Sequence, residues 1–228
     1  MRKTLPWLLW IWMSTVMVAA FFWAPALSGF VGEGESSRIV YFHVPMAWTA
    51  FLAFFLGGIL SAAYLVRRTA RLDAAAEAAI QLGFVFCVLA TVTGAIWSRI
   101  EWGAFWNWDP RQGTIALVLL FYAAYLALRS AVEDHEVRRR LAAGYAVLGL
   151  VVAPTLFWVV PRLMTSLHPE PVVNARGEVE MDASVLLLML ASWIGFMALF
   201  FWLQRIKVHL TLADQRRDRL RFERAEVG

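Results

Sequence analysis

The chain has 228 residues, of which 61% are hydrophobic and only 17% are charged. Soluble domains carry about 25% charged residues, so this composition excludes an ordinary soluble globular protein. The net charge of +4 comes from basic residues that collect between long uncharged stretches, which favours contact with membrane lipid over nucleic-acid binding.

Six uncharged apolar runs follow one another along the chain. They cover residues 5–27, 43–66, 78–97, 113–128, 141–160 and 183–203. A helix that spans a bilayer needs about 20 apolar residues, and tilt or local thinning can absorb the shortness of the fourth run. The runs contain no Asp, Glu, Lys or Arg, each of which would cost roughly 2.5–3.5 kcal/mol at mid-helix. The predicted fold class is all-α, a polytopic membrane protein with six transmembrane helices.

Basic residues indicate the orientation of these helices. Six spans place both termini on one side, and that side holds sixteen Lys and Arg residues against five on the other. This excess predicts that both termini are cytoplasmic. Arg2 and Lys3 also resemble the start of a signal peptide, but the length of the first run favours an uncleaved helix.

The chain is expected to divide after the sixth run. Residues 1–204 form the predicted six-helix transmembrane domain, and residues 205–228 form a basic cytoplasmic tail. The tail is expected to be helical. Two placements stay open: on the anionic inner leaflet, where a basic residue contributes about 1 kcal/mol, or in solvent, where it only enforces orientation.

The topology sorts the four histidines and the single cysteine. His135 and His209 fall on the inner side among charges and are expected to be ordinary solvated residues. His43, at the start of the second run, and His168, in the third outer loop, fall on the outer face. Cys87 is expected to be a packed apolar residue. Since there is no Cys-x-x-Cys-His motif, the chain is not itself a c-type cytochrome.

The second outer loop carries a tryptophan-rich interfacial segment, Trp-Gly-Ala-Phe-Trp-Asn-Trp-Asp-Pro-Arg, from Trp102 to Arg111. Trp102, Trp106 and Trp108 exceed what membrane anchoring requires. Trp102 and Trp106 share a face if the segment is helical, and Gly103 leaves room beside that face for a flat ring. The segment therefore predicts a platform for a large, flat, apolar ligand with a charged edge, and haem fits this description.

Charged residues border the platform. Asp109 precedes a proline and is expected to be the N-cap of the fourth helix first and a ligand contact second. Arg99 and Arg111 bracket the tryptophans and are candidates to hold the haem propionates, and Arg162 is a weaker one. Lipid phosphate or a nearby acid, Glu101 or Asp109, is the alternative partner of these arginines.

One histidine at a helix end is usually a polar cap or an interface residue. Two histidines on the same face, flanking an aromatic segment, indicate a haem-iron site instead, because haem iron takes axial ligands on opposite sides of its plane. His43 and His168 are therefore the candidate metal ligands, each through one ring nitrogen of a neutral imidazole.

The tryptophan-rich segment and the two outer histidines resemble those of a known family. Trp-Gly-x-x-Trp-x-Trp-Asp, ending at Asp109, is similar to the tryptophan-rich motif of the haem-handling proteins of cytochrome c biogenesis. Six helices and two outer histidines resemble the System I haem-handling protein C, also called haem exporter protein C, over nearly the whole chain. Arg111 matches that family, whereas Gln112 stands where its members have leucine and longer relatives have glutamate, so length and histidine count decide the subfamily.

The resemblance implies a site, a location and partners. It implies that His43 and His168 are the axial ligands of haem b and that the tryptophan-rich segment holds the haem. It also implies a place in the bacterial inner membrane, together with the ATPase and membrane subunits of an ABC transporter and a small single-helix subunit. A periplasmic haem chaperone would accept the haem covalently, and the protein would assist that bond without being an enzyme in the narrow sense.

Three other functions would each require different features of the sequence. A haem lyase that joins haem directly to apocytochrome would be expected to carry further histidine-bearing helices and a thioredoxin-like subunit. A transmembrane cytochrome b would place histidines deep within its helices, often near both faces. A permease would need a polar path at mid-membrane, and the spans offer only Ser, Thr and Gln for it.

Overall fold

The computed structural model describes residues 4–169 and 181–227, and within these ranges it contains helices and no strand. The helices are α1 (Thr4–Phe22), η1 (Glu35–Ile39), α2 (Val40–Arg67), α3 (Ala70–Trp102), α4 (Pro110–Ala131), α5 (His135–Pro154), η2 (Thr155–Val159), α6 (Val160–Leu163) and α7 (Ala183–Val227). Here η1 is a 3₁₀ helix, and η2 is a π-helical turn that joins α5 to α6. The all-α prediction is confirmed.

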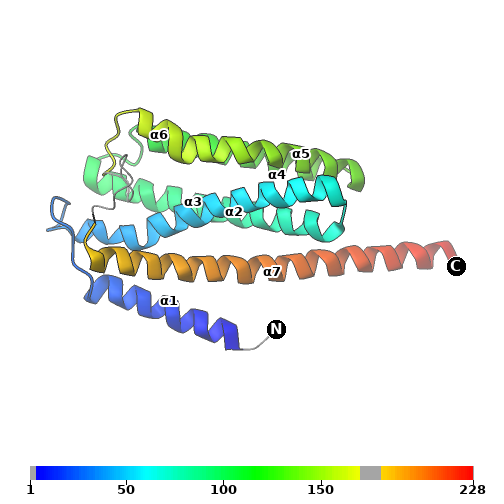
Figure 1. Ribbon diagram of the computed structural model, residues 1–228, viewed down its shortest axis with the longest axis horizontal. Coiled ribbons are helices and arrows are strands. Elements are labelled where there is room, and N and C mark those ends of the chain that lie inside the picture. The colour runs from blue at the N-terminus through cyan, green and yellow to red at the C-terminus, as the bar shows by residue number, and fades with distance from the viewer. Residues whose placement is uncertain (1–3, 170–180, 228) are drawn as a thin grey trace.

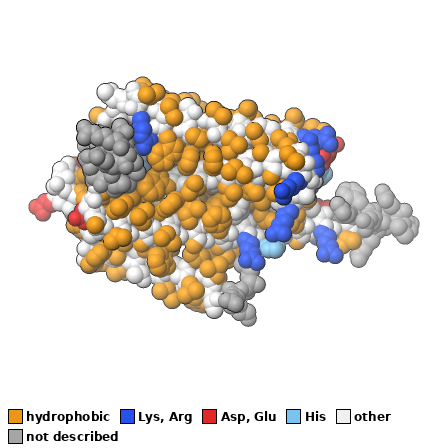
Figure 2. Space-filling model, in the orientation of Figure 1, with side chains coloured by type: hydrophobic (Ala, Val, Ile, Leu, Met, Phe, Trp, Pro, Cys, Tyr) orange, Lys and Arg blue, Asp and Glu red, His pale blue; other side chains and the backbone are white. Residues whose placement is uncertain are grey.

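Six helical stretches are long and apolar enough to cross a membrane, as predicted. Successive stretches run in opposite directions, so the described connecting residues after α1, α3 and α6 (23–34, 103–109 and 164–169) all lie at one end of the bundle (Figure 1). Between the ends, hydrophobic side chains cover most of the visible surface, and most of the Lys and Arg side chains in view gather at the end opposite these three connections (Figure 2). Because a water-exposed surface would not carry so much apolar area, this is a multi-pass membrane protein.

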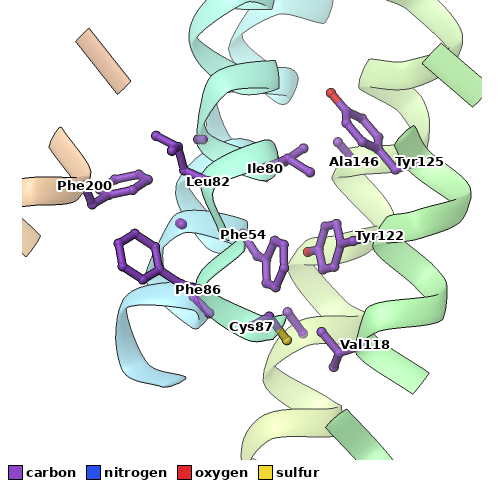
Figure 3. Close-up of a cluster of buried hydrophobic side chains, with 14 of the residues drawn as sticks. Phe54, Ile80, Leu82, Phe86, Cys87, Val118, Tyr122, Tyr125, Ala146 and Phe200 are labelled. Atoms are coloured by element: carbon purple, nitrogen blue, oxygen red, sulfur yellow. The ribbon is translucent and has the colours of Figure 1, made fainter. Parts of the chain in front are cut away.

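The helices approach closely where one of them presents a small residue. A Cβ atom on Gly57 of α2 would lie 2.5 Å from the side chain of Ile80 on α3, and one on Gly58 would lie 2.6 Å from Leu150 on α5. Lipid supplies no hydrophobic drive between helices, so close van der Waals packing of this kind holds them together. Phe54 of α2 and Tyr122 of α4 stack with ring centroids 3.6 Å apart (Figure 3). Cys87 is buried in this cluster, as expected.

The sixth span continues into the tail without a break. Helix α7 runs from Ala183 to Val227 and continues straight beyond the end of the bundle (Figure 1). The predicted domain boundary at residue 204 therefore falls inside one helix.

An ion cluster joins three helices at the end where α7 leaves the bundle. The guanidinium of Arg129 on α4 donates to both carboxylate oxygens of Asp73 on α3, at 2.8 and 3.2 Å, and to Glu77 at 2.7 Å. Arg139 of α5 lies 3.4 Å from Asp73. The side chains of Arg129 and Asp73 are only 8% and 3% exposed. Each charge is therefore buried and depends on its partner.

This dependence predicts a large effect of removing Arg129. We expect Arg129→Ala to lower the free energy of unfolding by about 3–5 kcal/mol, because Asp73 would remain buried without its main partner. Arg140→Ala is the matched control, since its pair with Glu136 is more than half exposed and should contribute less than about 1 kcal/mol. Denaturant unfolding of the two purified variants in detergent measures the difference, and equal effects would contradict a structural role for the cluster.

Candidate functional site

Side-chain hydrogen bonds join the three connections at this end of the bundle. Glu101, in the last turn of α3, accepts hydrogen bonds from the backbone N–H of Val31 (3.0 Å) and from the hydroxyl of Ser36. Asp109, before α4, accepts from the backbone N–H of Leu167 (2.6 Å) beyond α6. Segments more than fifty residues apart in the sequence thus form one structural unit.

A cavity of about 330 Å³ opens within this unit. Most of its lining is apolar and aromatic, with side chains from α2, α3, α4 and η2. Its ionisable lining groups among the described residues are two imidazoles and two guanidiniums, from His43, His168, Arg111 and Arg162. Since the described part of the lining contains no Asp or Glu, the site is suited to a largely apolar ligand that carries negative charge.

His43 lies in the first turn of α2 and packs against α3. A Cβ atom on Gly94 would lie 2.8 Å from Cε1 of the His43 ring, so only glycine lets the ring approach this closely. The ring Nδ1 lies 3.2 Å from the hydroxyl of Thr93, which itself donates to the backbone carbonyl of Leu89. In this arrangement Thr93 accepts the Nδ1 proton, and Nε2 keeps its lone pair.

His168 reaches the same cavity from the loop after α6. Its Nδ1 lies 2.8 Å from Oδ1 of Asp109. Burial lowers the pKa of His168 to about 4, although the Asp109 carboxylate beside it acts in the opposite direction. The contact therefore joins a neutral imidazole to a carboxylate, and Nδ1–H donates. His43 also contributes weakly to lowering this pKa, which indicates that the two rings are within electrostatic range of each other.

The three tryptophans of the motif occupy different places. Trp106 lines the cavity, whereas Trp102 lies outside its lining and packs its ring edge-on to His168, with centroids 4.8 Å apart. Trp108 is 80% exposed and contacts Trp106 edge-on. Because α3 ends at Trp102 and residues 103–109 are not helical, the condition under which Trp102 and Trp106 would share a helix face is not met.

Gly103 serves the backbone. Its φ of +78° ends α3 in the left-handed conformation, and nothing lies within 4 Å of a Cβ atom built on it. Arg99 also lies outside the cavity lining: it donates to the carbonyl of Gly103, and its guanidinium lies over the ring of Phe105. Arg111 and Arg162 line the cavity, whereas Arg99 is not among its described lining residues.

Several residues of the site could not be assigned to it from the sequence. Thr93 and Trp97 sit in an apolar run and look like packing residues, yet Thr93 contacts His43, and the Trp97 ring lies 6.0 Å from that of His168. Gln112 accepts from the backbone N–H of Asn107 (2.7 Å) and so shapes the tryptophan segment. Of these three residues, only Gln112 is unusual in the sequence, because it is polar at a position where the resemblance predicts leucine.

A π-helical turn adds to the cavity wall. After Pro154 the helix widens into η2, and Leu156, Phe157 and Trp158 of this turn line the cavity. Single π-helical turns inside longer helices are frequent at functional sites.

Fold and site together define a class of protein. This is a polytopic helical membrane protein with a cationic, aromatic-lined cavity at one end, and two imidazoles from separate elements line it. Residues 1–223 match the model of the heme exporter protein C family, and the chain belongs to that family. The family takes part in cytochrome c biogenesis and haem transport.

Curated relatives agree with this assignment. The heme exporter protein C of Bradyrhizobium diazoefficiens is 33% identical, over 83% of this chain and 69% of its own length. That of Paracoccus denitrificans is 31% identical, over 82% and 77%. A mitochondrial protein of Marchantia polymorpha, described as acting in cytochrome c biosynthesis, is 27% identical, over 82% and 79%.

Replacement by alanine should have opposite effects on stability at Gly103, which has a positive φ, and at Gly113, which is helical. Gly103→Ala should destabilise the protein by about 1–2 kcal/mol, because it forces alanine into the left-handed region. Gly113→Ala, inside α4 and with nothing within 4 Å of the added Cβ, should stabilise it by about 0.5–1 kcal/mol. Unfolding of both variants in detergent tests this, and a neutral Gly103→Ala would contradict the backbone role.

Proposed function

We propose that this protein binds haem b at the outer end of its bundle and presents it to a periplasmic haem chaperone for cytochrome c maturation. The observation that carries the proposal is the pair His43 and His168. Both line one cavity, and each has its Nδ1 engaged by a neighbour, which leaves Nε2 as the atom that could bind iron.

The lining suits the rest of the porphyrin. Haem is a flat apolar macrocycle with two carboxylates, and the cavity combines an apolar, aromatic surface with two guanidiniums. Arg111 and Arg162 would hold the propionates, since a guanidinium binds a carboxylate through two parallel hydrogen bonds. Trp106 would contact the macrocycle from the tryptophan segment. Bound haem supplies the vinyl group and the iron for the covalent step on the chaperone.

The remaining predicted site residues would act through their neighbours. Trp102 supports the ring of His168, and Trp108 packs against Trp106 at the exposed surface. Gly103 and Arg99 fix the turn that follows α3. Asp109 bonds to His168. In this proposal they shape the binding site rather than form its surface.

The location follows from charge. We propose that the protein lies in the bacterial inner membrane with the cavity end at the periplasm and both termini in the cytoplasm. The excess of Lys and Arg at the opposite end supports this orientation (Figure 2). The proposed partners are the ATPase and membrane subunits of an ABC transporter, a small single-helix subunit and the periplasmic chaperone, with lipid around the bundle.

The alternatives receive less support from the geometry. A cytochrome b that carries electrons across the membrane needs redox centres towards both faces, and here the two candidate ligands lie at one end. A haem lyase would need a site for apocytochrome thiols, and no specific feature of the described residues indicates one.

Ligation by two imidazoles predicts the absorption spectrum. The purified protein should carry six-coordinate, low-spin haem, because His43 and His168 would close both axial positions. His43→Ala and His168→Ala should each lower haem occupancy or yield a five-coordinate spectrum. The control is His135→Ala, an exposed residue at the other end of the bundle. An unchanged Soret band and spin state in both cavity variants would exclude the ligand assignment.

The orientation predicts which positions a membrane-impermeant maleimide can label. Glu33 and Glu133 are exposed at opposite ends of the bundle, and the native Cys87 is buried and gives little background. Glu33→Cys should react in intact spheroplasts, whereas Glu133→Cys should react only after the membrane is permeabilised. The reverse pattern would mean that the cavity faces the cytoplasm.

A further inference from the structure

Asp109 carries more hydrogen bonds than helix capping requires. Its side chain is fully buried. Oδ1 accepts from the backbone N–H of Arg111 (2.9 Å) and faces Nδ1 of His168 (2.8 Å). Oδ2 accepts from the backbone N–H of Leu167 (2.6 Å) and from the hydroxyl of Ser166 (2.9 Å). Only the bond to Arg111 belongs to the cap of α4.

We propose that Asp109 is a positioning residue for haem ligation, which fixes the tautomer of His168 and makes this imidazole the stronger iron donor of the two. The inference rests on the proposed function. Asp109 does not line the cavity and would not touch the haem. It acts through His168 by holding the proton on Nδ1, so that the lone pair on Nε2 is available to the iron.

The surroundings of Asp109 determine the direction of this hydrogen bond. An ionised carboxylate has about four lone-pair sites and no proton to donate. The two backbone N–H groups can only donate, and the Ser166 hydroxyl donates within this group. With these donors in place, Asp109 is ionised and His168 must supply the proton from Nδ1.

His43 has a different neighbour. Its Nδ1 faces the hydroxyl of Thr93, which donates its own proton to a backbone carbonyl and so accepts the ring proton. The Nδ1 proton of His43 is therefore held by a neutral oxygen, whereas that of His168 is held by a carboxylate. A carboxylate partner also makes an imidazole more basic than a hydroxyl partner does. The two axial positions would thus be unequal, with the stronger donor on the loop after α6 and the weaker one on α2.

Asp109→Asn tests the proposal in the full-length protein. Asparagine keeps the size of the side chain and can still cap α4, but its amide group donates where the carboxylate accepted. We expect a 10–100-fold loss of haem affinity, as for other lost partners of metal-binding histidines. In the haem that remains, the reduction potential should rise, because the His168 ligand donates less charge. Thr93→Val should raise the potential less.

A measurement without haem tests the tautomer directly. In ¹⁵N-histidine-labelled protein, the ring nitrogens of His168 should show the Nδ1–H form, and Asp109→Asn should shift them towards the Nε2–H form. Asp134→Asn is the matched control: Asp134 caps α5 through the same kind of bond to the backbone N–H of Glu136 and is exposed. Asp134→Asn should keep a comparable cap and change neither haem affinity nor the His168 signals.

Three outcomes are distinct. If Asp109→Asn keeps wild-type haem affinity, potential and nitrogen shifts while His168→Ala loses haem, the positioning role is wrong and the proposed function stands. If His43→Ala and His168→Ala both leave the spectrum unchanged, the proposed function itself fails. Should Asp109→Asn not fold, Asp109→Ser keeps a good N-cap and removes the carboxylate, and wild-type affinity in that variant would overturn the proposal.

Discussion

The hydrogen bonding of the buried Asp109 carboxylate is the interaction on which the cavity end of this protein depends. A charge removed from water must have its lone pairs satisfied, or its burial costs several kcal/mol. The donors come from two places: the first turn of α4 and the loop after α6. Satisfying one carboxylate therefore brings these segments together, and it carries His168 to the cavity wall.

The same requirement explains why the described lining of the cavity has basic groups and no acid. Two acids at this end of the bundle have hydrogen-bond donors: Asp109 has the donors described above, and Glu101 has Val31 and Ser36. The ionisable groups left on the described part of the lining are imidazoles and guanidiniums. An aromatic wall with these groups suits the flat, apolar, anionic molecule that we propose as its ligand, and this is consistent with membership of the heme exporter protein C family.

Helix caps and spans were predictable because they depend on local sequence. The six runs appear as helices, and Asp109 caps α4 as expected, because apolar length and an acid before proline act over a few residues. The roles of the three tryptophans were not predictable. Gly103 turns the chain out of the helix, so Trp102 supports His168, Trp106 faces the cavity and Trp108 points outwards. A motif gives the spacing of side chains, whereas the backbone dihedral angles give their directions.

The sequence by itself determined that the chain has six membrane-spanning helices and that two histidines and an aromatic segment lie at one end of them. Apolar length and charge determine whether each segment lies in lipid or in water, and both can be read along the chain. Only the tertiary structure decided which groups meet. The contact between Asp109 and His168 joins residues 59 positions apart, and that between His43 and Thr93 joins residues 50 apart. Such contacts depend on how helices pack and loops fold over them, and no local pattern records that.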